Sequence, residues 1–265
     1  MFNALPIITR CWLGITVVLT LSVNFGIVSS YHTHWAWDNV KTNLEVYRFL
    51  TPFCYAGGFS IGMLILCYTL YNFSKQYEEG IPYNTGGGGG TADYAFCLLL
   101  GAIGCLVTYP IANALNFFLS PLFCQNLVFY VLYIWSKKNL TASISIYGFP
   151  VQGLYLPFVL LALTVLTGQD PVPLLHGIFL GHVYYVMVDV IPVVYGKDYL
   201  LTPVFLINYF GVGEYRTESN RAAPARAQAP NTTNSNSANN NNNNNNSNQR
   251  TGHSWGSGGN RLGTN

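Results

Sequence analysis

Charged residues are confined to short segments of this chain, and long apolar stretches lie between them. The hydrocarbon core of a bilayer is about 30 Å thick, so a helix needs about 20 predominantly apolar residues to cross it. The stretch at residues 94–135 is long enough for two such helices, and Ser120-Pro121 interrupts it because proline cannot continue a helix. The pattern predicts six membrane-spanning helices, at residues 11–31, 49–73, two within 94–135 with a turn near 116–121, 151–167 and 173–195.

The composition agrees with this interpretation. Only 8% of the residues are charged and 50% are hydrophobic, whereas about 25% of the residues in soluble domains are charged. So few charges cannot cover a water-soluble surface. The net charge of +2 gives no electrostatic support for binding nucleic acid. We therefore expect an all-α membrane protein that does not bind nucleic acid.

The C-terminal part of the chain has a different composition. From Ala222 onward it consists mainly of Ala, Pro, Asn, Ser, Gly and Arg, and residues 231–250 contain 12 asparagines. Such a segment cannot bury enough apolar surface to offset its conformational entropy, so we expect it to be disordered. The predicted organisation is a membrane domain at 1–210, a disordered Asn-rich linker at 211–250 and a C-terminal motif at 251–265. Five glycines, Gly86–Gly90, predict a flexible linker within the membrane domain.

The distribution of Lys and Arg predicts the orientation, because these residues favour the cytosolic side. A cytosolic N-terminus places on that side Arg10, Lys75, Lys137, Lys138, Lys197 and every arginine of the tail. Only Lys41 and Arg48 then face the opposite side. Both termini are predicted to be cytosolic, which leaves the sequons at Asn72, Asn139, Asn231 and Asn245 without glycan. A glycan on Asn231 would contradict this topology.

The first non-cytosolic loop, residues 31–48, is rich in aromatic residues, with Tyr31, Trp35, Trp37 and Tyr47. Tryptophan and tyrosine favour the boundary between lipid and water. We therefore expect the loop to lie on the bilayer surface.

Polar residues within the apolar stretches are costly in lipid and usually face a partner or a cavity. They are Asn113, Asn116, Gln125 and Asn126 around the predicted turn, and His176, His182 and Asp189 in the last helix. One interpretation is that they hydrogen-bond one another between helices. The other is that they form a polar, partly hydrated interior open to the non-cytosolic side. Gly177 and Gly181 form a G-x-x-x-G pattern that allows two helices to approach closely. The six cysteines form no C-x-x-C pair and are interpreted as small buried side chains, without a metal site.

Several motifs support a family resemblance. They are Pro6-Ile7-Ile8-Thr9-Arg10 followed by Trp12, Glu45-Val46-Tyr47-Arg48-Phe49-Leu50-Thr51, Tyr133-Ile134-Trp135, Gly181-His182-Val183-Tyr184-Tyr185, Asp189-Val190-Ile191-Pro192 and Leu201-Thr202-Pro203-Val204-Phe205-Leu206. Together they resemble the derlin family, the rhomboid-like proteins of the endoplasmic reticulum. The resemblance covers about residues 5–210 and implies a six-helix rhomboid-like fold. It implies a loop element of Glu45, Tyr47, Arg48 and Thr51, and a helix-6 signature of Gly177, Gly181, His182, Tyr184 and Asp189.

The extreme C-terminus resembles the SHP box, with which derlins bind the AAA+ ATPase valosin-containing protein. Aligned on Leu262, Trp255 takes the aromatic position, and Ser257 replaces the first glycine. One aromatic and one aliphatic anchor with glycines between them can lie on a partner as an extended strand. The alternative is a low-complexity end that contains these two residues by chance. The expected ATPase-binding motif comprises Trp255, Gly256, Gly258, Gly259, Arg261 and Leu262.

A Cys-His intramembrane protease is an alternative that the sequence leaves open. Active rhomboids use a serine in G-x-S-G on helix 4 and a histidine on helix 6. Counting back from residues 133–135, Cys124 falls near the lost serine, and His182 falls near the lost base. Both glycines are absent, and a thiol buried in lipid stays protonated. Derlins lack the catalytic pair, so the resemblance implies no catalytic residue and no cofactor.

The resemblance implies a non-catalytic component of endoplasmic-reticulum-associated degradation. Misfolded proteins would enter a groove between helices 2 and 5 and be retrotranslocated to the cytosol, where the tail would recruit valosin-containing protein. The expected partners also include an ERAD ubiquitin-ligase complex, membrane lipid, and further copies or relatives in a homo- or hetero-oligomer. A small transporter or channel is the alternative from another class. Transporters often contain internal repeats, and the two halves of this chain show no self-similarity.

Overall fold

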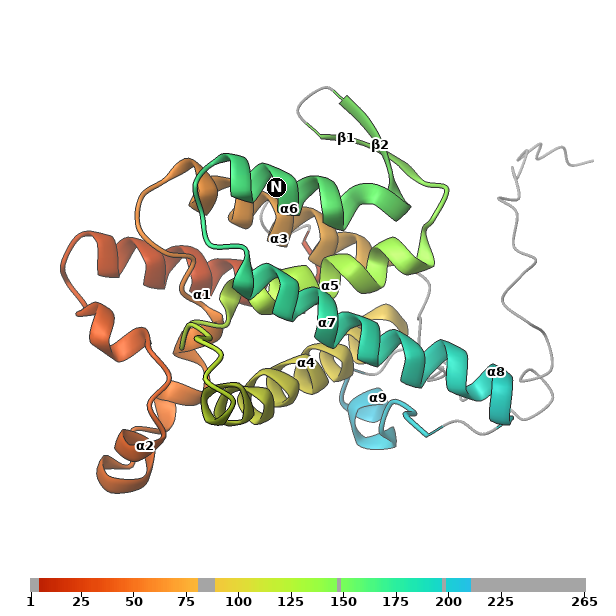
Figure 1. The fold of residues 1–265 in the computed structure, drawn as a ribbon. Coiled ribbons are helices and arrows are strands. Elements are labelled where there is room, and N and C mark those ends of the chain that lie inside the picture. Colours follow the sequence, from red (N-terminus) through yellow and green to blue (C-terminus); the bar gives the residue numbers. More distant parts are fainter. Residues whose placement is uncertain (1–4, 81–88, 147–148, 197–198, 211–265) are drawn as a thin grey trace, which may run out of the picture. The chain divides into compact units, whose positions relative to one another are not determined.

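The computed structural model describes residues 5–80, 89–146, 149–196 and 199–210 (Figure 1). Every described residue belongs to Met1–Ala222, the first of the two units into which the chain divides. The Asn-rich linker predicted at 211–250 and the motif predicted at 251–265 lie outside the described residues.

The first unit consists mainly of helices. In chain order they are α1 (Ile7–Asn24), α2 (Trp37–Asn43), α3 (Ile61–Glu79), α4 (Gly89–Ala114), α5 (Cys124–Lys138), α6 (Leu156–Leu166), α7 (Val172–Tyr185), α8 (Ile191–Tyr195) and α9 (Val204–Phe210). Within the described part of the chain, three helical stretches are long and apolar enough to cross a membrane. These stretches, Ile7–Asn24, Gly90–Ala114 and Val172–Tyr195, correspond to the first, third and sixth predicted helices.

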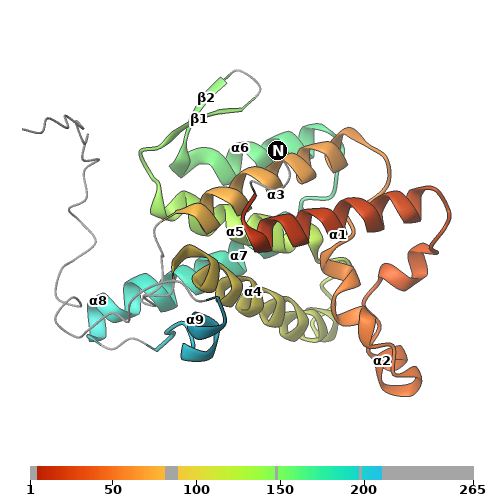
Figure 2. The same ribbon diagram turned by 180° about the vertical axis from the view of Figure 1, so that it is seen from behind.

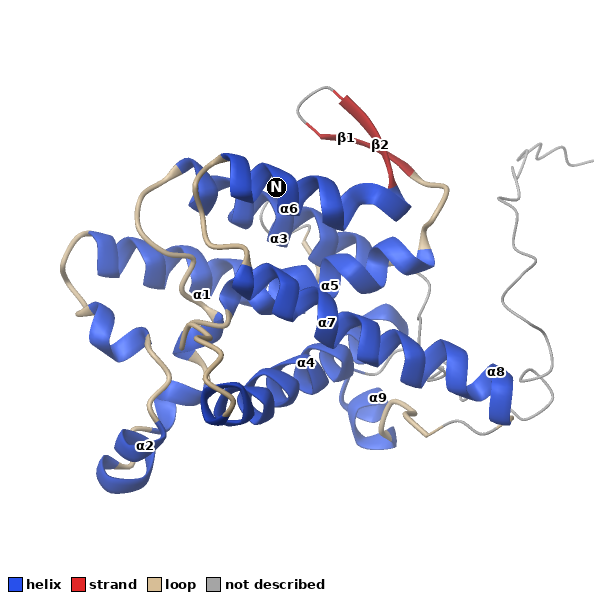
Figure 3. Cartoon of the chain, viewed as in Figure 1, coloured by secondary structure: helices blue, strands red, loops and turns tan. Residues whose placement is uncertain are grey.

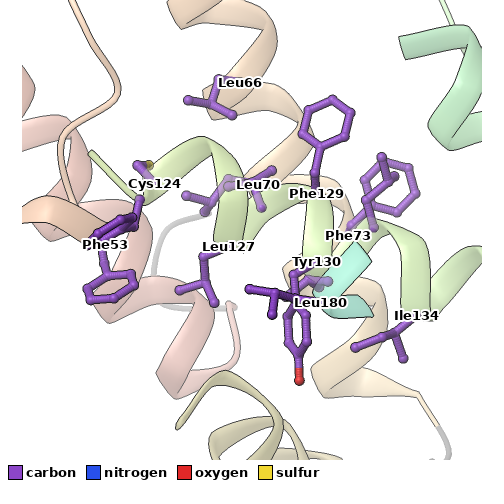
Figure 4. Close-up of a cluster of buried hydrophobic side chains, with 14 of the residues drawn as sticks. Phe53, Leu66, Leu70, Phe73, Cys124, Leu127, Phe129, Tyr130, Ile134 and Leu180 are labelled. Carbon is purple, nitrogen blue, oxygen red and sulfur yellow. The ribbon is translucent and has the colours of Figure 1, made fainter. Parts of the chain in front are cut away.

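Helix α5 lies at the centre of this unit and contacts α3, α4, α6 and α7. Of its 15 residues, 12 are buried. It belongs to one buried cluster with Phe53, Leu70 and Leu180, which come from distant parts of the sequence (Figure 4). Its neighbours also bury polar residues of α5 such as Asn126 and Ser136.

The outer surface of α4 is apolar. Leu99, Ile103, Val107 and Ile111 recur every four residues and are about half exposed, whereas Cys105 is fully buried. A helix on the surface of a soluble protein exposes polar residues instead. The exposed face of α4 therefore suits contact with lipid.

The second predicted helix begins later than expected, at Ile61 and not at residue 49. Residues 46–53 form two 3₁₀ turns. Gly57 has a φ of +99°, a conformation that interrupts a helix. Ser60 then caps α3, because its hydroxyl accepts a hydrogen bond from the Met63 N–H at 3.1 Å.

The expectation of an all-α fold is wrong at one place. Ser143–Ile146 (β1) and Phe149–Gln152 (β2) form an antiparallel hairpin between α5 and α6 (Figure 3). The hairpin takes the start of the predicted fifth helix, so α6 begins at Leu156 and not at residue 151. Isoleucines that alternate with serines favour a strand over a helix.

The glycine run predicted as a flexible linker belongs partly to a helix, because Gly89 and Gly90 begin α4. A Cβ on Gly90 would lie 2.2 Å from the carbonyl oxygen of Glu78. The absence of a side chain at Gly90 therefore lets the start of α4 pack closely against the end of α3. Residues 86–88 lie outside the described residues.

The last long helix changes its winding near its end. A π-helical turn, Val186–Val190, joins α7 to α8. Pro192 follows it, and proline has no N–H to donate to the carbonyl oxygen four residues earlier. The wider turn lets the helix continue past this position.

A buried carboxylate holds the start of α1. Glu78 on α3 accepts hydrogen bonds from the N–H groups of Ile8 and Thr9 at 3.0 and 2.8 Å, and from the Thr9 hydroxyl at 2.8 Å. The first N–H groups of a helix have no partner within it and carry partial positive charge. The carboxylate therefore ties α1 to α3, which lie side by side in Figure 2.

Candidate functional site

A narrow groove lies between α3 and α6, over α5. We call the end of the unit with residues 25–60 the loop end, and the end with β1 and β2 the hairpin end. Toward the loop end the groove contains a cavity of about 20 Å³, which is room for about one water molecule. Its polar lining residues come from separate elements: Thr69, Gln125, Thr164, Thr167 and Gln169.

The side chain of Gln169 lies directly against Gly62. A Cβ on Gly62 would be 2.4 Å from the Gln169 amide nitrogen, closer than real atoms approach. Glycine leaves room there for the amide in this position. Gln169 therefore reaches from the α6–α7 connection to the start of α3, at the loop end of the groove.

The predicted loop element is assembled around Arg48, which is 0% exposed. Its guanidinium donates hydrogen bonds to the carbonyl oxygens of Tyr31 and His34, each at 2.8 Å, and forms an ion pair with Glu45. The charge also lies 4.7 Å from the centre of the Tyr31 ring, a cation–π contact. Arg48 thereby joins the two ends of the loop.

The other predicted members of this element contact His32. The Tyr47 hydroxyl is 2.8 Å from His32 Nδ1, and the Thr51 hydroxyl donates to the His32 carbonyl oxygen at 3.0 Å. The side chains of Tyr47 and of the nearby Trp37 are 42% and 60% exposed. Exposed aromatic rings on such a loop suit the boundary between lipid and water.

The ion pair makes the loop sensitive to acid. Because Arg48 donates a hydrogen bond to Glu45 and carries the opposite charge, the pKa of Glu45 lies below its usual value. Such a carboxylate stabilises the fold above its unfolded-state pKa and loses this effect as the pH falls through its folded-state pKa. We predict that the loop of the purified protein loosens reversibly over that acidic range, measured by the fluorescence of Trp35 and Trp37. Glu45→Gln should remove the transition, and its persistence would contradict the role of this ion pair.

Two glycines of the helix-6 signature face α5. A Cβ on Gly177 would lie 2.3 Å from the Asn126 carbonyl oxygen, and one on Gly181 would lie 3.1 Å from that of Tyr130. The backbones of α5 and α7 approach so closely that a side chain at position 177 has no space. This contact holds α7 against the central helix.

His176 on α7 forms hydrogen bonds with polar side chains of two other helices. Its Nδ1 accepts a hydrogen bond from the Asn126 amide at 2.6 Å, and its Nε2 lies 2.7 Å from the Thr108 hydroxyl. That hydroxyl donates to the Gly104 carbonyl oxygen at 2.7 Å. The chain of donors therefore places the proton of a neutral His176 on Nε2. It links α4, α5 and α7 through polar groups, as the first interpretation of these residues expected.

The remaining residues of the signature lie along the second half of α5. His182 Nδ1 is 2.8 Å from the Tyr133 hydroxyl, and Asp189 forms an ion pair with Lys138. Tyr184 is buried, with its ring 5.8 Å from that of Tyr130. In contrast, Asn113 and Asn116 are exposed and take no part in the interior.

The structure does not bring Cys124 and His182 together. His182 contacts Tyr133, nine residues further along α5, which corresponds to about 13 Å at the helical rise of about 1.5 Å per residue. Cys124 is 1% exposed, whereas His182 lies on an exposed face of α7. Cys124 and His182 therefore lie too far apart to form a catalytic pair, so they cannot both occupy the positions of the lost serine and the lost base.

Sequence reasoning missed part of the groove and two buried carboxylates. Thr69 and Thr164 occur singly in apolar stretches and Gln169 lies in a short polar connection, so only their meeting in space distinguishes them. Glu78 and Asp93 lie near the ends of α3 and α4, and their low exposure, 4% and 1%, is a property of packing alone. Cys11 is exposed, unlike the buried Cys54, Cys97, Cys105 and Cys124.

The fold and the site define a helical membrane protein that lacks the catalytic pair considered above. Comparison with known proteins gives the family. Residues 5–204 match the profile of the Der1-like family. The chain is 32% identical to Derlin-1 of Arabidopsis thaliana over 203 residues, which cover 76% of this chain and 73% of that protein. It is 34% identical to Derlin-2 of Oryza sativa subsp. japonica over 215 residues, covering 77% and 83%.

The chain belongs to the Der1-like family, the derlins. Proteins of this family are rhomboid-like pseudoproteases, so the chain is not an enzyme. The predicted family resemblance is thereby confirmed.

Proposed function

We propose that this derlin is a non-catalytic component of endoplasmic-reticulum-associated degradation that helps move misfolded proteins from the lumen or membrane to the cytosol. The observation that carries the proposal is the polar groove between α3 and α6 in a pseudoprotease. Polar side chains at membrane depth usually face a cavity or a partner. Here Thr69, Gln125 and Thr164 line a site that performs no cleavage.

The helices beside this groove are short. With 15 and 11 residues, α5 and α6 rise about 22 and 16 Å, less than the bilayer core of about 30 Å. We propose that six helices cross the endoplasmic reticulum membrane in a rhomboid-like fold, namely α1, α3, α4, α5, α6 and α7–α8. The bilayer beside the groove would thin to match them, which lowers the cost of moving polar chain through it.

The orientation follows from the basic residues. The loop end would face the lumen, where Arg48 holds the aromatic loop at the membrane surface. The hairpin end, with Lys137 and Lys138, would face the cytosol together with both termini. An open apolar groove of about 390 Å³ along α1, lined by Ile15, Val18 and Leu19 among others, suits an acyl chain of membrane lipid.

The C-terminal motif would recruit valosin-containing protein, whose ATP hydrolysis supplies the force for extraction. Trp255 and Leu262 are the proposed anchors, with Gly256, Gly258, Gly259 and Arg261 between them. An ERAD ubiquitin-ligase complex and a homo- or hetero-oligomeric assembly complete the proposed partners.

The size of the cavity in the groove between α3 and α6 argues against transport of a small molecule through that groove. Pockets for such ligands have volumes of about 300–1,000 Å³. The cavity at the loop end of the groove has about 20 Å³. A flexible polypeptide that separates two helices as it enters does not need a preformed pocket of that size.

The test is degradation of a misfolded lumenal protein in cells that lack this derlin and express variants of it. Wild type should shorten the client half-life and co-purify with the ATPase, and Trp255→Ala/Leu262→Ala should do neither. Asn243→Ala/Asn244→Ala in the same tail is the matched control and should behave as wild type. A client half-life that does not respond to the wild-type protein would overturn the proposed function.

A further inference from the structure

The groove extends to the hairpin end of the unit. A second cavity of about 20 Å³ lies there, and its lining includes Asn72, Ile144 and Ser145. Ile65, Thr69 and Leu160 line both cavities. The two cavities are therefore successive parts of one groove, separated by these three side chains. Strand β1 forms part of the wall where the groove ends.

The pairing of the hairpin shows which backbone groups of β1 are free. Ser145 pairs with Pro150, and Ile144 pairs with Val151. Residues of an antiparallel pair alternate between facing the partner strand and facing away from it with their N–H and C=O groups. Proline has no N–H to donate, so Pro150 occupies a position whose backbone groups face away from the partner strand. The N–H and C=O of Ser145 therefore point to the outer edge of β1, and so do those of Ser143, two residues earlier.

Nothing among the described residues pairs with this edge, because the sheet has two strands. Pro150 removes one donor from the opposite edge of the hairpin, whereas β1 contains no proline. Both serine side chains are exposed, and Ile144 between them is partly buried. The hairpin is also anchored, since Gly153 N–H donates to the Ala142 carbonyl oxygen at 2.7 Å.

We propose that the outer edge of β1 is a docking site for an extended segment of the client polypeptide, which pairs with Ser143 and Ser145 as it leaves the groove. The inference rests on the proposed function, because it takes the groove as the client path. An extended chain adds to a free strand edge through main-chain hydrogen bonds. Such bonds do not depend on side chains, which suits clients of unrelated sequence. Pairing also satisfies client backbone groups that would otherwise be unpaired near the membrane.

The test replaces the N–H of Ser145. Ser145→Pro removes the outward donor and leaves the bonds between β1 and β2, as Pro150 already does on the other strand. Ser145→Ala is the matched control, because it removes only the hydroxyl. A photoreactive residue at position 143 reports contact with a stalled client in the full-length protein in microsomes. We expect Ser145→Pro to lower the client cross-link about fivefold, the effect of one lost hydrogen bond, and Ser145→Ala to leave it unchanged.

Three results would overturn the proposal. One is an equal client cross-link in Ser145→Pro and wild type. Another is a cross-link from position 143 to a second copy of this chain, which would make the edge an oligomer interface. The third result concerns a second variant, used if Ser145→Pro fails to accumulate. This variant is Ser143→Pro with the photoreactive residue at position 145, and a client cross-link as strong as that of wild type would contradict the proposal. In each case wild type still shortens the client half-life, so failure of this inference is distinct from failure of the proposed function.

Discussion

Replacing Gly177 by alanine is expected to separate α5 from α7 and to lower the free energy of unfolding by about 3 kcal/mol. The added Cβ would meet the Asn126 carbonyl oxygen at 2.3 Å. That atom belongs to the backbone of the central helix, so it cannot turn away as a side chain can. The measurement is the unfolding midpoint of the purified protein in detergent or bicelles, followed by circular dichroism.

Two other glycines provide a graded control. A Cβ on Gly181 would meet the Tyr133 side chain at 3.0 Å, and one on Gly104 would meet the end of the Leu180 side chain at 3.3 Å. Gly181→Ala should therefore cost about 1–2 kcal/mol. Gly104→Ala should be nearly neutral, because Leu180 can shift and alanine favours a helix by about 1 kcal/mol. If Gly177→Ala proved as stable as Gly104→Ala, the close approach of the two helices would be disproved.

Replacing Arg48 by alanine is expected to release the first loop and to destabilise it by about 3 kcal/mol, since two charge-assisted hydrogen bonds to partly buried carbonyl oxygens are lost. The carbonyl oxygens of Tyr31 and His34 would lose these donors. Protease sensitivity of residues 31–48 in permeabilised microsomes, where the protease reaches the proposed lumenal side, measures the release. Client degradation should fall with it, because the loop lies at the proposed lumenal end of the unit, where clients would enter.

Arg48→Lys distinguishes charge from geometry. Lysine keeps the charge but cannot direct separate donors to Glu45, Tyr31 and His34 as a planar guanidinium does. We expect Arg48→Lys to have a protease sensitivity between that of wild type and that of Arg48→Ala. A fully protected loop in Arg48→Ala would show that the aromatic contacts alone hold it.

Hydropathy located the long helices well, because each one faces lipid over much of its surface and its composition reflects that environment. The apolar stretches at α1, α4 and α7–α8 are examples, and the break between α4 and α5 lies in the predicted region, where Asn116 has a φ of +59°. Helix starts were less predictable. Gly57 and the Ser60 cap delay α3, and apolar residues 49–60 carry no hydropathy signal of that delay.

The hairpin was missed for a local reason. Phe149, Pro150 and Val151 are apolar and lie shortly before the apolar α6, so they extend its hydropathy pattern. The alternation of serine and isoleucine at 143–146 was the available signal, but four residues decide little until a partner strand is placed beside them. The strand at 143–146 therefore depends on the pairing of Ile144 with Val151, which the sequence pattern does not reveal.

The sequence by itself determined the class of protein: few charges, long apolar stretches and the motifs around Arg48, His182 and Pro192 identify a helical membrane protein of the derlin family. Only the tertiary structure decided which polar residues act together. Thr69, Gln125 and the pair Thr164 and Gln169 come from three separate parts of the chain and meet because α3 and α6 both pack on α5. It likewise placed His182 beside Tyr133, away from Cys124. Hydropathy reports the preference of each segment for lipid, whereas contacts between segments depend on how the helices pack.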